Sequence, residues 1–502
     1  MEVGGFPVWC GLLWVDPTLH VSSAAQFSST SFLVSRPNEV LVHRQRFSKH
    51  LNAVAIMELR RETPFNELYP TPEALHEALQ KINDIALYEV SIDEPIQIRL
   101  ITPVSTDQWL VDDNYNDYRL TNPEEYQDGL KYVTVSYCWK QTQSSLDSSA
   151  LPRYHITGRP GTSEPTPISC PELVFHRAML FARSRECPYL WIDQECIDQA
   201  DPMDIQEHLK IMHHVYERSM WTVAPLSYTI TDMSLAESLT TYLWDDRIKY
   251  AHWEKGYEAE WDYRYTSNFQ PYLRDSYELL DAIGNDKWFT RTWAFQEKLC
   301  ATRLDFLVPM DESQETSDAV QHHLIGTDLC LDFGQIRSRL AHLEIKVNDT
   351  QQANVPGCHK PWSVQQKAFV EHKFAIFGFP YPHWSQYSDL VYNTIQECEN
   401  LVVADRLTIF GHACRLRWRH VSGLLDSPQY DLNTCIMALV LANYLNGRLP
   451  PVYLAKKLWQ HCSVRSGGKD ITSPHYLDLV LKRANAGMVR VYRRRRDQTL
   501  CR

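Results

Sequence analysis

The sequence predicts an α/β fold: a mostly parallel β-sheet flanked by helices, followed by a helical C-terminal region. Three observations lead to this class. Short apolar runs alternate with amphipathic helical patterns between residues 96 and 310. Each apolar run stops at a polar residue or a proline, as buried strands do. Beyond residue 310 the sequence pattern becomes that of helices. Strands that alternate with helices at this spacing are typical of parallel sheets covered on both faces.

The strands and helices can be placed one by one from apolar runs and capping residues. A first helix is expected from Pro72, because Thr71 is a suitable N-cap and proline suits the first helical position. Three further helices are expected, beginning at Pro171, beginning at Pro202, and following Asp286 as an N-cap. The strands are expected at residues 96–101, 132–137, 189–193, 221–224 and 303–308.

The length of 502 residues exceeds what one core normally organises, so several units are expected. We predict a poorly defined segment at residues 1–60, a short helical lead-in at 61–95, the α/β domain at 96–310 and the helical region at 311–502. Two stretches inside the α/β domain, residues 141–169 and 229–280, are predicted to be loop insertions.

Charge and cysteine content exclude several classes of protein. The net charge of −12 argues against a chain that coats nucleic acid or an anionic membrane. The run Arg493–Arg496 is the local exception; we interpret it as a solvated basic tail, with nuclear import as the alternative. The closest of the 13 cysteines, Cys187 and Cys196, lie nine residues apart, so we expect reduced thiols and no metal site. The apolar run 435–445 is too short to span a bilayer, so a cytoplasmic protein is expected.

Three motifs together resemble the heterokaryon-incompatibility (HET) domain of fungi. The first, Val133–Trp139, resembles the family's strand ending in Ser-Tyr-x-Trp, and the second, Leu190–Gln199, resembles its Leu-Trp-Ile-Asp-x-x-Cys-Ile-Asn-Gln signature. The third, Trp288–Glu297, resembles its Trp-Phe-x-Arg-x-Trp-x-x-Gln-Glu segment. Lys140 and Asp198 depart from this pattern, since they stand where the family usually has glycine and asparagine.

This resemblance implies a trigger of fungal non-self recognition and programmed cell death. HET domains are in turn similar in fold to TIR domains, whose catalytic members cleave NAD at the nicotinamide–ribose bond with a glutamate in a Trp-x-x-x-Glu spacing. Trp293 and Glu297 have that spacing, which places both side chains on one helix face. The resemblance thus implies a TIR-like core, Glu297 as the catalytic group and NAD or a related nucleotide as substrate, with no bound cofactor.

Further candidate binding residues lie where open α/β sheets bind ligands, at the carboxyl ends of strands. Ser136 is a candidate donor to phosphate or ribose, and Trp139 a candidate for stacking on a base. Each has a structural alternative: short polar side chains often cap loops, tryptophans are often core residues, and a helix carboxylate is often solvated. The full set of candidate binding residues is Ser136, Tyr137, Trp139, Asp193, Arg291 and Trp293.

Two other interpretations of the domain compete with the enzyme hypothesis. The domain could act without catalysis, by self-association or by docking a partner protein, or it could be a silent member of its family. No GxGxxG or Walker pattern occurs, which argues against a dehydrogenase or an ATPase. The enzyme hypothesis requires Glu297 to line a cleft with Ser136, Trp139 or Asp193 nearby, whereas the non-catalytic interpretation tolerates a Glu297 that points to open water.

Overall fold

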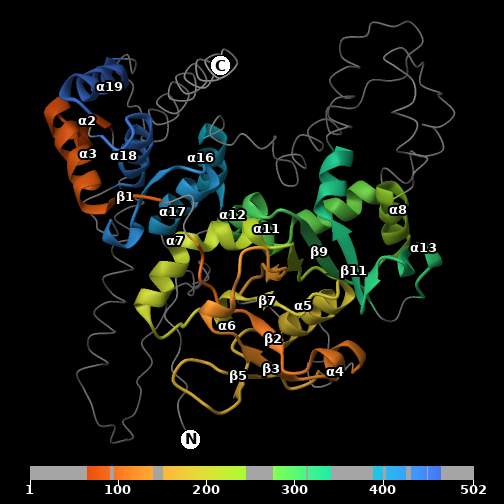
Figure 1. Ribbon diagram of the computed structural model, residues 1–502. Helices are drawn as coiled ribbons and strands as arrows, with labels where there is room; N and C mark the ends of the chain where they lie inside the picture. The colour runs from red at the N-terminus through yellow and green to blue at the C-terminus, as the bar shows by residue number, and fades with distance from the viewer. Residues whose placement is uncertain are drawn as a thin grey trace, which may run out of the picture. The chain divides into compact units, whose positions relative to one another are not determined.

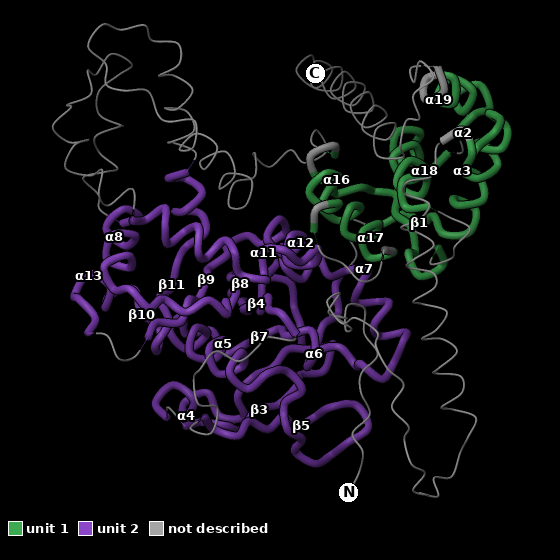
Figure 2. The backbone as a smooth tube through the Cα atoms, turned by 180° about the vertical axis from the view of Figure 1, so that it is seen from behind, with its two compact units in different colours: residues 1–94, 383–502 green, residues 95–382 purple. Residues whose placement is uncertain are grey.

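A computed structural model describes residues 65–90, 95–112, 114–139, 151–244, 275–311, 315–340, 388–398, 403–425, 431–448 and 450–464. The chain divides into two compact units, one made of residues 1–94 with 383–502 and the other of residues 95–382 (Figure 2). The predicted segment 1–60, Lys140 and the run Arg493–Arg496 lie outside the described residues.

The central unit, residues 95–382, is built on a ten-stranded mixed sheet (Figure 1). Its strand order is β10-β11-β9-β8-β4-β7-β2-β3-β5-β6. In chain order the strands are β2 (Ile101–Pro103), β3 (Asp117–Leu120), β4 (Val133–Val135), β5 (His155–Thr157), β6 (Thr166–Pro167), β7 (Leu190–Trp191), β8 (Trp221–Pro225), β9 (Leu304–Pro309), β10 (Leu324–Ile325) and β11 (Asp328–Asp332).

The prediction of a mostly parallel sheet was wrong. The four central strands β9, β8, β4 and β7 run parallel, and so do β3 and β5, but the other five pairs are antiparallel. One reason is that β10 and β11 are joined by only two residues, Gly326 and Thr327, and so form a hairpin. Gly326 has a φ of 60°, a backbone conformation that glycine adopts without strain. The sheet therefore continues past residue 310 into the stretch predicted as helical.

Capping residues explain where the principal helices begin. The side chain of Asp201 accepts from the backbone N–H of Met203, and the side chain of Asp286 accepts from that of Trp288. The helix expected after Asp286 is in fact two helices that meet at Arg291, whose backbone is extended. The helices of the central unit are α4 (Thr106–Val111), α5 (Glu172–Ser184), α6 (Asp193–Cys196), α7 (Pro202–Arg218), α8 (Met233–Trp244), α11 (Lys287–Thr290), α12 (Thr292–Cys300) and α13 (Asp318–Gln321).

The expected loops at 141–169 and 229–280 contain regular structure in their described parts. The strands β5 and β6 lie in the first stretch and helix α8 in the second. Figure 1 shows α7 and α12 on one side of the sheet and α5 on the other.

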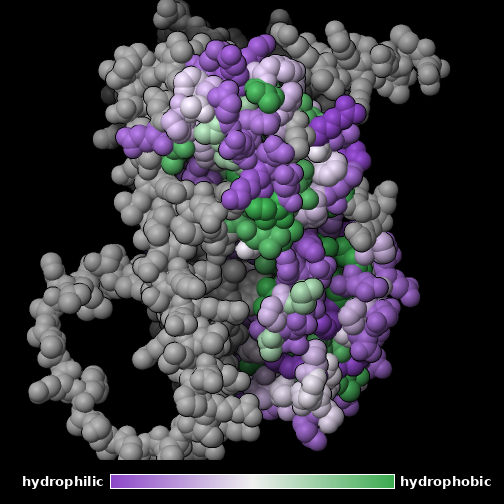
Figure 3. All heavy atoms as spheres, turned by 90° about the vertical axis from the view of Figure 1, so that its left-hand side faces the viewer, coloured by the Kyte–Doolittle hydropathy of each residue, from purple (hydrophilic) through white to green (hydrophobic). Residues whose placement is uncertain are grey.

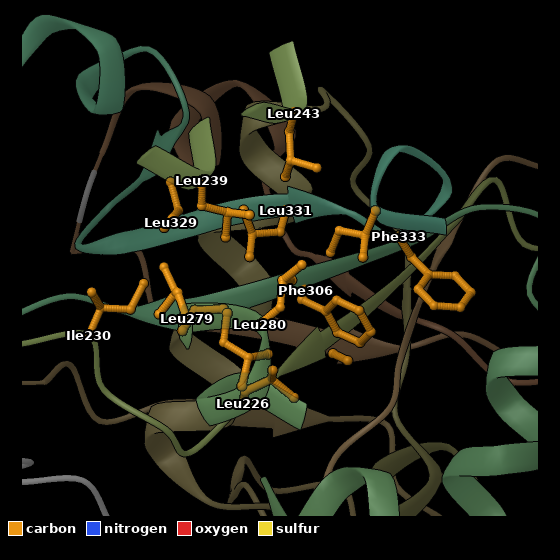
Figure 4. Packing of buried hydrophobic residues seen from close by; sticks show 14 of the residues in the cluster. Leu226, Ile230, Leu239, Leu243, Leu279, Leu280, Phe306, Leu329, Leu331 and Phe333 are labelled. Atoms are coloured by element: carbon orange, nitrogen blue, oxygen red, sulfur yellow. The ribbon is translucent and has the colours of Figure 1, made fainter. Parts of the chain in front are cut away.

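A large apolar cluster forms between the α8 segment and strands β8, β9 and β11 (Figure 4). Phe306, Leu331 and Leu239 are fully buried in it. One polar group is also buried nearby: Arg177 of α5 pairs with Asp328 at 2.8 Å and donates to the backbone carbonyls of Leu226 and Leu307 at 2.7 Å. This guanidinium joins α5 to β11, to β9 and to the residue after β8. Its hydrogen bonds also give the buried carbonyl oxygens of Leu226 and Leu307 a donor.

The second unit combines the two ends of the chain. β1 (Leu87–Glu89) pairs antiparallel with β12 (Trp418–His420), and the Tyr69 hydroxyl donates to Asp431 at 2.9 Å. Helix α3 begins with the expected cap, since Thr71 accepts from the backbone N–H of Ala74 at 3.2 Å. The helices of this unit are α2 (Phe65–Leu68), α3 (Pro72–Ala86), α16 (Ser388–Glu397), α17 (Val403–Ala413), α18 (Leu432–Tyr444) and α19 (Val452–Val464), with a 3-10 turn at Ser422–Leu424.

From residue 388 onward, the described part of the C-terminal region is mostly helical, as predicted, with the short strand β12 between its helices. Helix α18 is 13 residues long and almost wholly buried. Within the described part of the chain, no helix has both the length and the apolar character needed to cross a bilayer. Hydrophilic residues predominate on the face displayed in Figure 3, with smaller hydrophobic groups between them.

Candidate functional site

The candidate residues of the first two motifs follow neighbouring strands. Ser136, Tyr137 and Trp139 come directly after β4, and Asp193 comes two residues after the end of β7. Because β4 and β7 are paired in parallel, their carboxyl ends lie at the same edge of the sheet. These polar side chains therefore lie at the edge of the sheet where open α/β sheets bind ligands.

Glu297 of α12 meets this edge at Ser136. The Ser136 hydroxyl donates to Oε2 of Glu297 and accepts from the indole Nε1 of Trp288 at 2.7 Å. Ser136 is only 1% exposed, whereas Glu297 is half-buried. This contact brings Glu297 beside a residue that follows a strand, and its catalytic role stays a prediction.

Burial raises the pKa of Glu297 to about 7. The hydrogen bond from Ser136, the nearby guanidinium of Arg291 and a hydrogen bond from Tyr216 lower the pKa, and the carboxylate of Asp193 raises it. Burial dominates because the charged form loses more hydration than these contacts replace. The carboxyl group is therefore close to half ionised at neutral pH.

Asp193 is surrounded by donors from its own domain. Its Oδ1 accepts from the Tyr137 hydroxyl at 3.0 Å and from the backbone N–H of Gln194 at 2.7 Å. Its Oδ2 accepts from the indole of Trp139 at 2.8 Å. Burial raises the pKa of Asp193, and the hydrogen bonds from Trp139, Gln194 and Tyr137 oppose that rise. These contacts make Asp193 an anchor that joins the loop after β4 to α6.

Arg291 links the two groups of residues. It is half-buried between α11 and α12, and its guanidinium donates to the carbonyl oxygen of Tyr137. Its positive charge also acts on the carboxyl groups of Glu297 and Asp193. A guanidinium between two half-buried carboxyl groups offsets part of their mutual repulsion.

Trp293 is half-buried on α12, four residues before Glu297, and its role in ligand binding stays a prediction. Phe289, four residues before Trp293 in the sequence, packs against the rings of Trp288 and Phe306. The break at Arg291 places Phe289 and Trp293 on different helices.

Three residues near the site were not among the sequence candidates. Trp288 donates to Ser136, Tyr216 of α7 lies beside Glu297, and the side chain of Gln194 accepts from the Tyr137 hydroxyl at 2.6 Å. Trp288 is the first residue of the third motif, so its place in that motif was an available signal. The contact that Tyr216 makes depends on how α7 packs against α12 and has no local signal in the sequence.

The second motif also contains a buried structural carboxylate. Glu195 is 4% exposed, pairs with Arg159, and accepts from the backbone N–H groups of Ser169 and Cys170. It therefore fastens the segment that contains β5 and β6 to α6. Asp198 organises a turn, as its Oδ1 accepts from the backbone N–H of Ala200 at 2.9 Å.

None of the described residues form a group of three or more His, Cys, Asp or Glu side chains that could hold a metal ion.

Comparison with known proteins agrees with the motifs. Residues 132–297 match the family model described as Heterokaryon incompatibility protein (HET). The match begins just before β4 and ends at Glu297, so it contains every candidate residue. No curated protein and no solved structure matches the chain. The chain therefore carries a heterokaryon-incompatibility domain at residues 132–297.

Proposed function

We propose that the HET domain hydrolyses NAD at the nicotinamide–ribose bond, and that this activity triggers programmed cell death during fungal non-self recognition. The observation that supports it best is the contact between Glu297 and Ser136 at the end of β4, beside the Asp193 anchor. A carboxyl group that is half-buried and half ionised near pH 7 suits work on a developing positive charge.

The reaction proposed is a hydrolysis without a redox step. The bond between the ribose C1′ and the nicotinamide nitrogen breaks, and its electron pair leaves with nicotinamide. Ionised Glu297 stabilises the oxocarbenium-like sugar that forms. Water then adds to C1′ and releases a proton to solvent, so that the products are nicotinamide, ADP-ribose and H⁺.

The side chains around Glu297 have separate tasks in this proposal. Arg291 is the group suited to a phosphate of the substrate, because guanidinium and phosphate form paired hydrogen bonds. Trp139, whose indole N–H is held by Asp193, offers its ring for stacking against a base. Ser136 is too buried to contact substrate directly and instead orients Glu297.

The decisive experiment is an assay of free nicotinamide after purified full-length protein is incubated with NAD. Wild-type protein should release nicotinamide, and Glu297→Gln should reduce the rate at least about a hundredfold, the scale on which loss of a stabilising charge acts. Glu164→Gln is the matched control, since Glu164 is an exposed carboxylate of the same unit. Background release from wild type and from Glu297→Gln alike would remove the proposal.

The cellular part is tested separately. Forced expression in the cytoplasm of a fungal host should halt growth, and Glu297→Gln and Trp293→Ala should each relieve the arrest. If Glu297→Gln arrests growth as strongly as wild type, the domain acts by self-association or by docking a partner. Normal growth with abundant wild-type protein would count against the cell-death role itself.

A further inference from the structure

Trp288, Ser136 and Glu297 form a chain of hydrogen bonds with a defined direction. The indole Nε1 of Trp288 can only donate, so the Ser136 hydroxyl oxygen accepts that bond at 2.7 Å. The hydroxyl proton then points to Oε2 of Glu297, which accepts it. Three different segments contribute: α11, the residue after β4, and α12.

The donor end of this chain is fixed by the core. Trp288 is 1% exposed, and its ring packs edge-on against Phe289 and Phe306, with centroids 4.9 and 5.3 Å away. Figure 4 labels Phe306 within the apolar cluster. The indole nitrogen is thus the only polar atom of a side chain otherwise surrounded by apolar groups.

The backbone of Trp288 is fixed as well. Its N–H donates to Oδ1 of Asp286 at 2.8 Å, while Oδ2 of Asp286 accepts from the backbone N–H groups of Ser227 and Tyr228. The short helix α11 is therefore tied to the loop after β8. Because both the ring and the backbone of Trp288 are fixed, its indole nitrogen cannot move with the Glu297 side chain. The indole therefore determines the direction in which the Ser136 hydroxyl donates.

We propose that Trp288 is a positioning residue for Glu297, and that it acts through Ser136 as a relay. The proposal rests on the proposed function for its role in catalysis, but the contacts that carry it do not depend on that activity. A hydroxyl that already accepts a hydrogen bond donates a stronger one, because the two bonds polarise each other. The relay therefore favours the ionised form of Glu297 and fixes one of its oxygens.

Other charged and titratable groups also face Glu297. Arg291 and Tyr216 favour the ionised form, and Asp193 opposes it. The Cys138 thiol interacts with Arg291 and is itself affected by Glu297. All four are present in variants that interrupt only the relay, so a change in those variants reports on Trp288 and Ser136.

The test measures the pKa of Glu297 without any assay of activity. The free energy of unfolding of the full chain is followed from pH 5 to pH 9 in four backgrounds: wild type, Trp288→Phe, Ser136→Ala and Trp109→Phe. Each is compared with the same background carrying Glu297→Gln. The midpoint that gives the pKa of Glu297 is the pH, on the alkaline side, at which the slope of the free-energy difference has fallen to half its maximum. Trp109 is a fully buried tryptophan of α4 and controls for the loss of indole volume.

We expect the midpoint to rise by about half a pH unit or more in Trp288→Phe and Ser136→Ala, since each removes support from the ionised form. Trp109→Phe should leave it unchanged. If Trp288→Phe does not fold, Ser136→Ala carries the test alone. Midpoints equal to wild type in the relay variants would overturn the proposal, whereas absence of NAD cleavage with shifted midpoints would overturn only the proposed function.

Discussion

The raised pKa of Glu297 predicts how the free energy of unfolding depends on pH, and this can be measured without substrate. The pKa of this carboxyl group is raised from 4.5 to about 7 in the folded chain. A group whose pKa is raised on folding binds its proton more tightly in the native state. Its contribution to stability is complete below pH 4.5 and is lost as the pH rises through 7. Replacing Glu297 with glutamine should therefore stabilise the protein at alkaline pH and not at acidic pH.

The size of the effect follows from the two pKa values. At about 1.4 kcal/mol for each pH unit, the interval from 4.5 to about 7 corresponds to about 3.5 kcal/mol, most of it between pH 5 and pH 8. Glutamine keeps an oxygen that accepts the hydrogen bond from Ser136, so the change removes the charge and leaves the contact.

Denaturant unfolding at pH 5 and pH 8 would measure this effect, with Glu164→Gln as the control. Asp305 in the same unit has a pKa raised by burial to about 6, so it also makes the free energy of unfolding depend on pH over this range. That dependence is common to wild type and variant, so only their difference is informative. A Glu297→Gln curve parallel to that of wild type would refute the reasoning, because it would mean that the carboxyl group keeps its ordinary pKa in the native state.

Three other substitutions test contacts described above. Asp328→Asn leaves the buried guanidinium of Arg177 without its counter-charge, and should cost about 3 kcal/mol in denaturant unfolding; a loss below about 1 kcal/mol would contradict that role. Glu195→Gln weakens the attachment of the β5–β6 segment, and limited proteolysis should cleave residues 151–170 faster than in wild type, with equal rates arguing against the attachment. Trp139→Phe deprives Oδ2 of the half-buried Asp193 of its indole donor and should lower the free energy of unfolding by about 1–3 kcal/mol, so unchanged stability would contradict the anchor.

Local chemistry explains why many elements could be predicted. Thr71 and Asp201 are polar caps in front of helical patterns, and each caps the helix that was expected, whereas Asp286 caps only α11, the first of the two helices that follow it. The strand expectations at 132–137, 221–224 and 303–308 correspond to β4, β8 and β9, whose apolar runs are almost wholly buried. A cap or an apolar run is a property of a few consecutive residues, so it can be recognised without knowing the fold.

Pairing between distant segments could not be predicted in this way. The alternation of strands and helices correctly indicated parallel pairing for β4, β7, β8 and β9, but every flanking pair except β3–β5 is antiparallel. Leu87 pairs with His420, and nothing in either local sequence specifies the other. The same limit applies to the site: the motifs placed Ser136 directly after a strand and Glu297 on a helix, while the donation from Trp288 depends on tertiary packing.

The unit formed by both chain ends has a consequence for how the protein is made. Helix α3 leaves the ribosome early, with an apolar stripe of Leu75, Leu79 and Ile82 that is fully buried in the finished unit. Its partners α18 and α19 are translated only at residues 432–464. During synthesis that stripe therefore stays exposed to solvent while the residues of the ten-stranded sheet are translated. Exposed apolar surface of this kind favours aggregation and chaperone binding. A premature stop before residue 432 would consequently leave the N-terminal helix without the surface that buries it.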